Sequence, residues 1–167
     1  MKFIDAFIVF SIIDHMNQTP SLIVNTEIMK NNLDILVKKC QLLSIEFRPH
    51  VKTIHAPVLS SILLAKGIKA ITVSNIDMFE AFASAGWMDI CLAKVCSIDE
   101  LKQLQSFIDR GVRCSVYVDN IEQLRVLDQV PGPFNVCVDI DSGQYRSGVL
   151  WNLESSIIEL ILLDIDE

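Results

Sequence analysis

The sequence predicts an α/β protein, an incomplete parallel (β/α) barrel of the TIM type, from three observations. Short runs of β-branched residues alternate with longer segments of helical periodicity, which is the pattern of a parallel sheet covered by helices. The ends of the expected strands recur every 21 to 24 residues, which suits one strand, one helix and two short connections. A complete eight-unit barrel needs at least about 200 residues. Five such units within 167 residues therefore cannot close a barrel.

The expected strands follow from the β-branched runs and from their even spacing. The runs lie at 22–24, 70–73, 90–93, 114–118 and 135–140, and strand ends recur near Lys52, Ser74, Val95, Asp119 and Asp141. Such regularity favours a barrel over a doubly wound sheet, whose crossovers vary more in length. Because the carboxyl ends of parallel strands share one edge, we expect these five positions at one rim.

Helices are expected between the strands, with recognisable beginnings and ends. Apolar residues between positions 28 and 40 follow a helical spacing. Segment 97–100 fits an N-terminal capping box, segment 120–123 is a weaker version of one, and Pro57 stands where a first helical turn tolerates proline. Gly67, Gly86 and Gly111 each follow a helical stretch, as C-terminal stop signals do. A last apolar helix is expected over 153–163.

The chain is expected to comprise an N-terminal packing segment, residues 1–19, and one barrel domain, residues 20–167. The apolar run 3–13 is too short to span a bilayer, which takes about 20 residues. Asp5 interrupts this run and no small-residue cleavage site follows, so a packing helix is favoured over a degenerate targeting segment. No other stretch predicts a membrane span.

Charge and cysteine content argue against several classes of partner. The net charge of −7 argues against nucleic acid, since phosphate binding needs a basic surface. The five cysteines include no Cys-x-x-Cys pair, and no histidine lies near Cys91 and Cys96, so no metal site is predicted. Free cysteines are typical of a reducing compartment, which predicts a cytoplasmic protein.

Lys52 is the first candidate for chemistry. It lies in the segment Arg-Pro-His-Val-Lys-Thr, residues 48–53, at the expected inner end of a buried strand. Burial disfavours the charged form of a lysine, and the neutral amine is the nucleophile that a Schiff base requires. Arg48 and His50 are expected on the same face of that strand. The alternative is a basic strand end that meets solvent.

Arg146 is the second candidate, in a polar loop at residues 139–149 that contains two glycines and follows an apolar strand. Such a loop can bring a guanidinium and backbone amides to an anion. The alternative is an ordinary turn between a strand and the next helix.

Together the two segments resemble the family of D-threonine aldolases and eukaryotic-type D-serine dehydratases. The matching motifs are Arg-Pro-His-x-Lys-Thr at 48–53 and Asp-x-Gly-x-x-Arg-x-Gly at 141–148. Thr-Pro-x-Leu at 19–22 and Thr-Val-Ser-Asn at 72–75, followed by Glu80-Ala81, agree with the same family. The resemblance covers about residues 19–149 and implies a barrel of the alanine racemase N-terminal kind.

The resemblance implies a pyridoxal-phosphate enzyme that acts on small D-3-hydroxy amino acids, either splitting the α–β carbon bond or eliminating the β-hydroxyl. Lys52 matches the lysine that binds the cofactor covalently, and Arg146 matches an arginine near the cofactor's phenolic oxygen. His50 matches a residue of the pocket, as does Arg48. Ile54 stands where the family often has a histidine, and His55 follows one place later.

The resemblance also implies a homodimer and a divalent metal, but the family's metal ligands and phosphate-gripping loops come from later regions without a counterpart in this sequence. Two functions are therefore weighed. The first is the N-terminal part of a D-3-hydroxy-amino-acid lyase. The alternative is a truncated non-catalytic remnant, or a pyridoxal-phosphate-binding protein without lyase activity.

Overall fold

The structure is a computed structural model that describes residues 23–152. The chain divides into two compact units, Met1–Glu46 and Phe47–Glu167. The expected packing segment 1–19 and the expected helix 153–163 lie outside the described residues. The division of the chain at residue 19 therefore stays a prediction.

The described part of the first unit is dominated by one helix, α1 (Thr26–Leu42). Asn25 caps this helix, because its side-chain oxygen accepts hydrogen bonds from the backbone N–H groups of Glu27 and Ile28, both at 3.1 Å. The helical spacing seen in the sequence is thus confirmed. The strand expected at 22–24 is not formed by Ile23 and Val24, which lie in neither a helix nor a strand.

The second unit is built on a parallel sheet of four strands in the order β1-β2-β3-β4. The strands are β1 (Ile71–Val73), β2 (Asp89–Val95), β3 (Arg113–Val118) and β4 (Asn135–Val138). All three neighbouring pairs are parallel. At the outer edge of β1, His50 forms a single parallel bridge with Thr72. Spatial order follows chain order, as the barrel prediction requires.

The last expected strand, 135–140, is interrupted at Asp139. Its N–H donates to the Val118 carbonyl at 2.8 Å, and its carbonyl accepts from the Val149 N–H at 2.8 Å. Beyond this residue, β5 (Ile140–Asp141) pairs in parallel with β6 (Val149–Leu150) as a separate two-stranded sheet. The chain therefore leaves the four-stranded sheet at the position where the polar loop begins.

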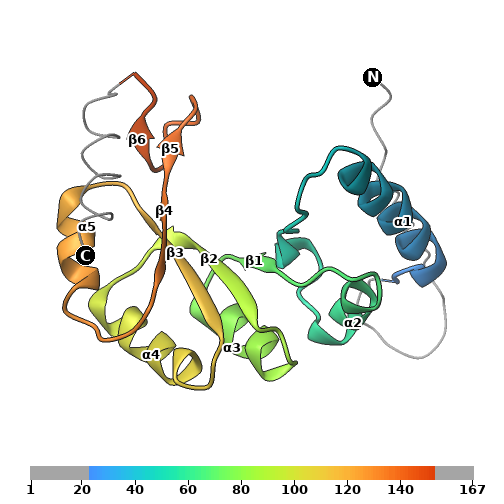
Figure 1. Cartoon of the computed structure of the whole chain (residues 1–167), viewed down its shortest axis with the longest axis horizontal. Helices are drawn as coiled ribbons and strands as arrows, with labels where there is room; N and C mark the ends of the chain where they lie inside the picture. The colour runs from blue at the N-terminus through green and yellow to red at the C-terminus, as the bar shows by residue number, and fades with distance from the viewer. Residues whose placement is uncertain (1–22, 153–167) are drawn as a thin grey trace, which may run out of the picture. The chain divides into compact units, whose positions relative to one another are not determined.

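Four helices alternate with the strands of the second unit: α2 (Pro57–Ala65), α3 (Ile76–Ser84), α4 (Ile98–Ile108) and α5 (Ile121–Leu127). The expected signals are confirmed. Ser97 and Glu100 form a complete capping box, Asn120 caps α5, and Pro57 is the first residue of α2. The glycines after α2, α3 and α4 all have positive φ. The helices α3, α4 and α5 lie along one face of the sheet (Figure 1).

The two faces of the sheet differ in chemistry because successive side chains point to opposite sides. Ile90 and Leu92 of β2 are both fully buried on one face, as expected beneath covering helices. Asp89 and Cys91 point to the opposite face, which corresponds to the interior of a barrel.

Candidate functional site at the carboxyl edge of the sheet

The loops that carry the candidate residues leave the sheet at its carboxyl edge. Ser74 follows β1, Val95 ends β2, Asp119 follows β3 and Asp141 lies shortly after β4. Because the strands are parallel, these positions share one edge, which confirms the expected rim for four of its five positions. In barrel enzymes the active site lies at this edge.

Lys52 lies in a short 3₁₀ helix (Val51–Thr53), rather than at the inner end of a strand as expected. The side-chain Nδ1 of His50 accepts a hydrogen bond from the backbone N–H of Lys52 at 3.2 Å and caps this turn. The chain therefore leaves the sheet directly after the bridge to Thr72. Val51 is fully buried and anchors the turn, whereas Lys52 is exposed. The expectation that Lys52 is buried at the end of a strand is wrong for this structure.

The Lys52 amine is nevertheless available for chemistry. Within residues 23–152 it makes no hydrogen bond or ion pair. Partial burial, reinforced by the positive charge of Lys52, lowers the pKa of His50 below its ordinary value. His50 is therefore neutral at pH 7, which agrees with Nδ1 acting as a hydrogen-bond acceptor.

Arg48 contacts the amino end of the sheet and does not lie at its carboxyl edge. Its guanidinium lies 2.8 Å from a carboxylate oxygen of Asp89, and Arg113 pairs with the other oxygen of the same carboxylate. Asp89 begins β2 and Arg113 begins β3, so this contact lies at the amino end of the strands. Arg48 therefore does not join Lys52 in one site, because the buried Asp89 carboxylate needs its charge.

Arg146 is carried by a loop that folds around Asp141. The side chain of Asp141 accepts hydrogen bonds from the N–H groups of Gly143, Gln144 and Tyr145, at 2.9 to 3.1 Å. These three amides are therefore bound to Asp141 and are not offered to an anion in this structure. Arg146 itself is exposed and, within the described part of the chain, has no hydrogen-bond or ion-pair partner. The guanidinium is the group that this loop offers.

The glycine that ends the motif is required by close packing of the loop. Gly148 has a φ of +100°, and a Cβ at this position would lie 2.7 Å from the backbone nitrogen of Asp141. Any other residue would clash with the backbone where β5 and β6 pair. The motif thus encodes a closed loop, in addition to an arginine.

Lys94 and Glu100 form a polar contact at the same edge that was not anticipated from the sequence. Lys94 Nζ lies 2.6 Å from Glu100 Oε1, and the second carboxylate oxygen of Glu100 accepts from the Ser97 N–H at 2.9 Å. Burial would raise the pKa of Glu100, but these hydrogen bonds outweigh burial and lower the pKa. The capping-box pattern pointed to Glu100, whereas the partner Lys94 depends on how β2 meets α4.

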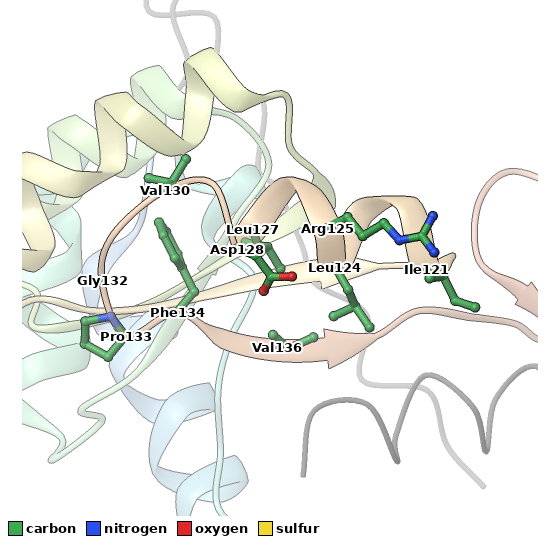
Figure 2. A pocket seen from close by; sticks show the side chains of 10 residues that line it. All are labelled: Ile121, Leu124, Arg125, Leu127, Asp128, Val130, Gly132, Pro133, Phe134 and Val136. Atoms are coloured by element: carbon green, nitrogen blue, oxygen red, sulfur yellow. The ribbon is translucent and has the colours of Figure 1, made fainter. Parts of the chain in front are cut away.

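A groove of about 550 Å³ lies between α5 and the segment that leads into β4 (Figure 2). Its walls combine apolar side chains, such as Leu124, Phe134 and Val136, with the charged side chains of Arg125 and Asp128. None of the motif residues lines this groove. It belongs to the helical side of the sheet and is not the candidate site.

Two further properties of the described residues bear on the site. Among residues 23–152, no three His, Cys, Asp or Glu side chains gather in a way that could hold a metal ion. None of the described helices is long and apolar enough to cross a membrane.

Residues 24–163, most of the chain, match the family described as alanine racemase, N-terminal domain. The chain belongs to this family. The parallel sheet, in chain order and with helices along one face, is the corresponding part of a TIM-type barrel. The predicted fold class is thereby confirmed.

The similar proteins have names that agree with the resemblance seen in the motifs. The chain is 28% identical over 135 residues to a D-threo-3-hydroxyaspartate dehydratase of Delftia sp. (strain HT23), covering 78% of this chain and 36% of that protein. It is 27% identical to a D-threonine aldolase of Arthrobacter sp, with the same coverage. The solved D-threonine aldolase of Filomicrobium marinum matches with a TM-score of 0.72 at 24% identity, covering 79% of this chain and 37% of that one. The chain thus spans about a third of the length of these relatives.

Proposed function

We propose that the chain is the N-terminal, cofactor-binding part of a pyridoxal-phosphate-dependent lyase that acts on D-3-hydroxy amino acids. One observation carries the proposal. Lys52 and Arg146 belong to the two motifs that resemble the family, Lys52 directly after the bridge of His50 to β1 and Arg146 in the loop after β5. Both side chains are exposed, and within residues 23–152 neither has a hydrogen-bond or ion-pair partner, so both are accessible to a ligand.

The available groups fit part of the cofactor. When bound, pyridoxal phosphate supplies an aldehyde that condenses with an amine and a ring that withdraws electrons from the substrate. The Lys52 amine suits the aldehyde, and the Arg146 guanidinium suits an anionic ring oxygen. The amides of Gly143, Gln144 and Tyr145 are already bound to Asp141, so these three are not available to the phosphate.

His50 supports the amine in two ways. It caps the 3₁₀ turn through the Lys52 N–H, which holds the backbone from which the lysine extends. Its lowered pKa keeps the imidazole neutral at pH 7, so its Nδ1 remains able to accept this hydrogen bond.

The same proposal includes a small D-amino acid as substrate, a homodimeric state and a location in the cytoplasm. The names of the two curated relatives, an aldolase of D-threonine and a dehydratase of D-threo-3-hydroxyaspartate, support a small D-amino acid with an oxygen on its β-carbon. Both proteins share the matched region with this chain. The choice between carbon–carbon cleavage and dehydration therefore lies with residues outside the shared features.

The proposal is tested by trapping the cofactor on the chain. The protein is incubated with pyridoxal phosphate, reduced with borohydride, digested and analysed by mass spectrometry. The label is expected on Lys52, and Lys52→Ala is expected to lose it. Lys69→Ala, which changes another exposed lysine of the same unit, is the matched control and should keep the label. Equal labelling of all exposed lysines would show that Lys52 is not a cofactor site.

A further inference from the structure

The carboxylate of Asp141 is bound more completely than an ordinary turn requires. Its Oδ1 accepts from Gly143 N at 2.9 Å, Gln144 N at 2.9 Å and Tyr145 N at 3.1 Å, while Oδ2 also accepts from Tyr145 N at 3.1 Å. The residue is only 6% exposed although the loop around it is exposed. The hydrogen bond from Gly143, with those from Tyr145 and Gln144, lowers the pKa of Asp141 against the effect of burial. A carboxylate in this state is an internal anchor for the loop.

Tyr145, the residue directly before Arg146, has a strained backbone. Its φ is +53°, in the left-handed region that bulky residues avoid. Its side chain is 84% exposed, so packing of the ring does not hold it there. The Tyr145 N–H is instead held by both oxygens of Asp141. The hydrogen bonds of Asp141 therefore compensate for the strain, and the turn directs the chain into Arg146.

The other side of the loop is closed independently. Ile140 pairs with Val149 in the β5–β6 ladder, and Gly148 packs against the backbone of Asp141 too closely for a side chain. Arg146 thus stands on a loop whose two ends meet and whose tip is shaped by one carboxylate. Such a rigid support is what a site needs if a single guanidinium is to meet a ligand oxygen at a fixed place.

We propose that Asp141 is the positioning residue for Arg146: it holds Tyr145 in the left-handed conformation and thereby fixes the direction of the arginine. The inference rests on the proposed function, in which Arg146 contacts the cofactor, and it adds a residue that acts without contacting the ligand. It also explains why the motif joins an aspartate to the arginine five residues later. The loop uses its amides to fix its own shape, and it offers the guanidinium to the ligand.

The first test needs no cofactor. Amide hydrogen exchange and backbone order parameters of residues 143–146 are measured by NMR in the wild-type chain, Asp141→Asn and Asp141→Ala. Asparagine keeps the oxygen that accepts three of the bonds, so Asp141→Asn is expected to stay near wild type. In Asp141→Ala we expect exchange at these amides to rise about tenfold or more, with lower order at Arg146. Unchanged exchange and order in Asp141→Ala would overturn the proposal.

The second test asks whether Asp141 acts through Arg146. The dissociation constant for pyridoxal phosphate is measured for Asp141→Ala, Arg146→Ala and the double variant, with Ser142→Ala as a control in the same loop. Asp141→Ala and Arg146→Ala are expected to weaken binding to a similar extent, and the double variant is expected to be no weaker than Arg146→Ala. Additive losses would overturn the inference. Failure of the wild-type chain to bind would count against the proposed function, while the cofactor-free test would still decide the role of Asp141 in the loop.

A third variant covers the case in which Asp141→Ala does not fold. Glycine adopts the left-handed conformation without strain, so Tyr145→Gly removes the reason for the anchor. In the Tyr145→Gly background, Asp141→Ala is expected to fold and to raise amide exchange at Arg146 less than it does with tyrosine present. An equal or larger effect in that background would show that the anchor does not act through Tyr145.

Discussion

At the scale of single residues, the site depends on two side chains that bond to backbone amides rather than to a ligand. His50 caps the turn that carries Lys52, and Asp141 shapes the loop that carries Arg146. Both are acceptors, and both depend on their protonation state. The placement of Lys52 and Arg146 therefore depends on these two acceptors.

His50 makes the stability of the fold sensitive to mild acid. Its pKa is lowered in the folded chain, chiefly by burial and then by the charge of Lys52, so the unfolded chain binds the proton more readily. Stability contributed by neutral His50 is complete above the unfolded value of about 6.5 and is lost as the pH falls toward the folded value. Urea unfolding at several pH values should therefore show a loss of stability below about pH 6.5.

Asparagine at position 50 provides the control for this prediction. His50→Asn keeps a side-chain oxygen that can cap the turn but does not titrate, so its stability should depend less on pH in this range. His55→Asn changes a neighbouring histidine whose left-handed backbone asparagine tolerates, and it should retain the wild-type pH dependence. An unchanged pH profile in His50→Asn would mean that another group titrates.

At the scale of secondary-structure elements, the ends of the helices are fixed by local signals. The capping box of α4 joins Ser97 and Glu100, and Lys94 from the end of β2 adds an ion pair to the same carboxylate. The cap thus links a strand, a connection and a helix at the carboxyl edge. This contact sets where α4 begins relative to the sheet.

Removal of the Ser97 hydroxyl is expected to destabilise the fold by about 1 kcal/mol, the usual cost of losing such a cap. The free energy of unfolding of Ser97→Ala measures this effect. Ser106→Ala is the matched control, because Ser106 lies within α4 and is exposed, and its hydroxyl donates only to the Gln103 carbonyl. Equal losses of unfolding free energy in the two variants would show that the capping box stabilises the fold no more than an ordinary serine within the helix.

At the scale of the whole molecule, the chain corresponds to one part of longer relatives. It spans about a third of the length of the curated relatives, 36% in each case. The described residues present an amine and a guanidinium, but no group of metal ligands. Cofactor attachment needs little more than the amine, whereas turnover requires that the cofactor and the substrate be held in place.

We expect the 167-residue chain to show little or no lyase activity by itself. Without an anchored cofactor, the reaction loses positioning that can contribute roughly 7–11 kcal/mol to lowering a barrier. The test incubates the chain with D-threonine or D-serine, pyridoxal phosphate and manganese or zinc, and measures glycine, acetaldehyde and pyruvate. A full-length D-threonine aldolase assayed in parallel serves as the positive control. Robust product formation that disappears in Lys52→Ala would contradict this expectation.

The sequence by itself determined the order of the elements and both motifs. Local signals such as the β-branched runs, the capping box at Ser97 and the glycines after the helices act over a few residues, so they can be recognised without the fold. The even spacing of the strand ends predicted parallel strands in chain order, and the sheet confirms it. The same spacing predicted that Lys52 and Arg146 lie at one edge, and for this pair it stays a prediction.

Only the tertiary structure decided what the polar residues contact. Arg48 is drawn to the amino end of the sheet because the buried Asp89 carboxylate lies there, on a strand 41 positions further along the chain. Lys52 leaves the sheet because His50 makes only one bridge and then caps a turn. The amides of the Arg146 loop bind Asp141 because the loop closes on itself. Such partners are chosen by burial and distance in three dimensions, which local sequence patterns do not encode.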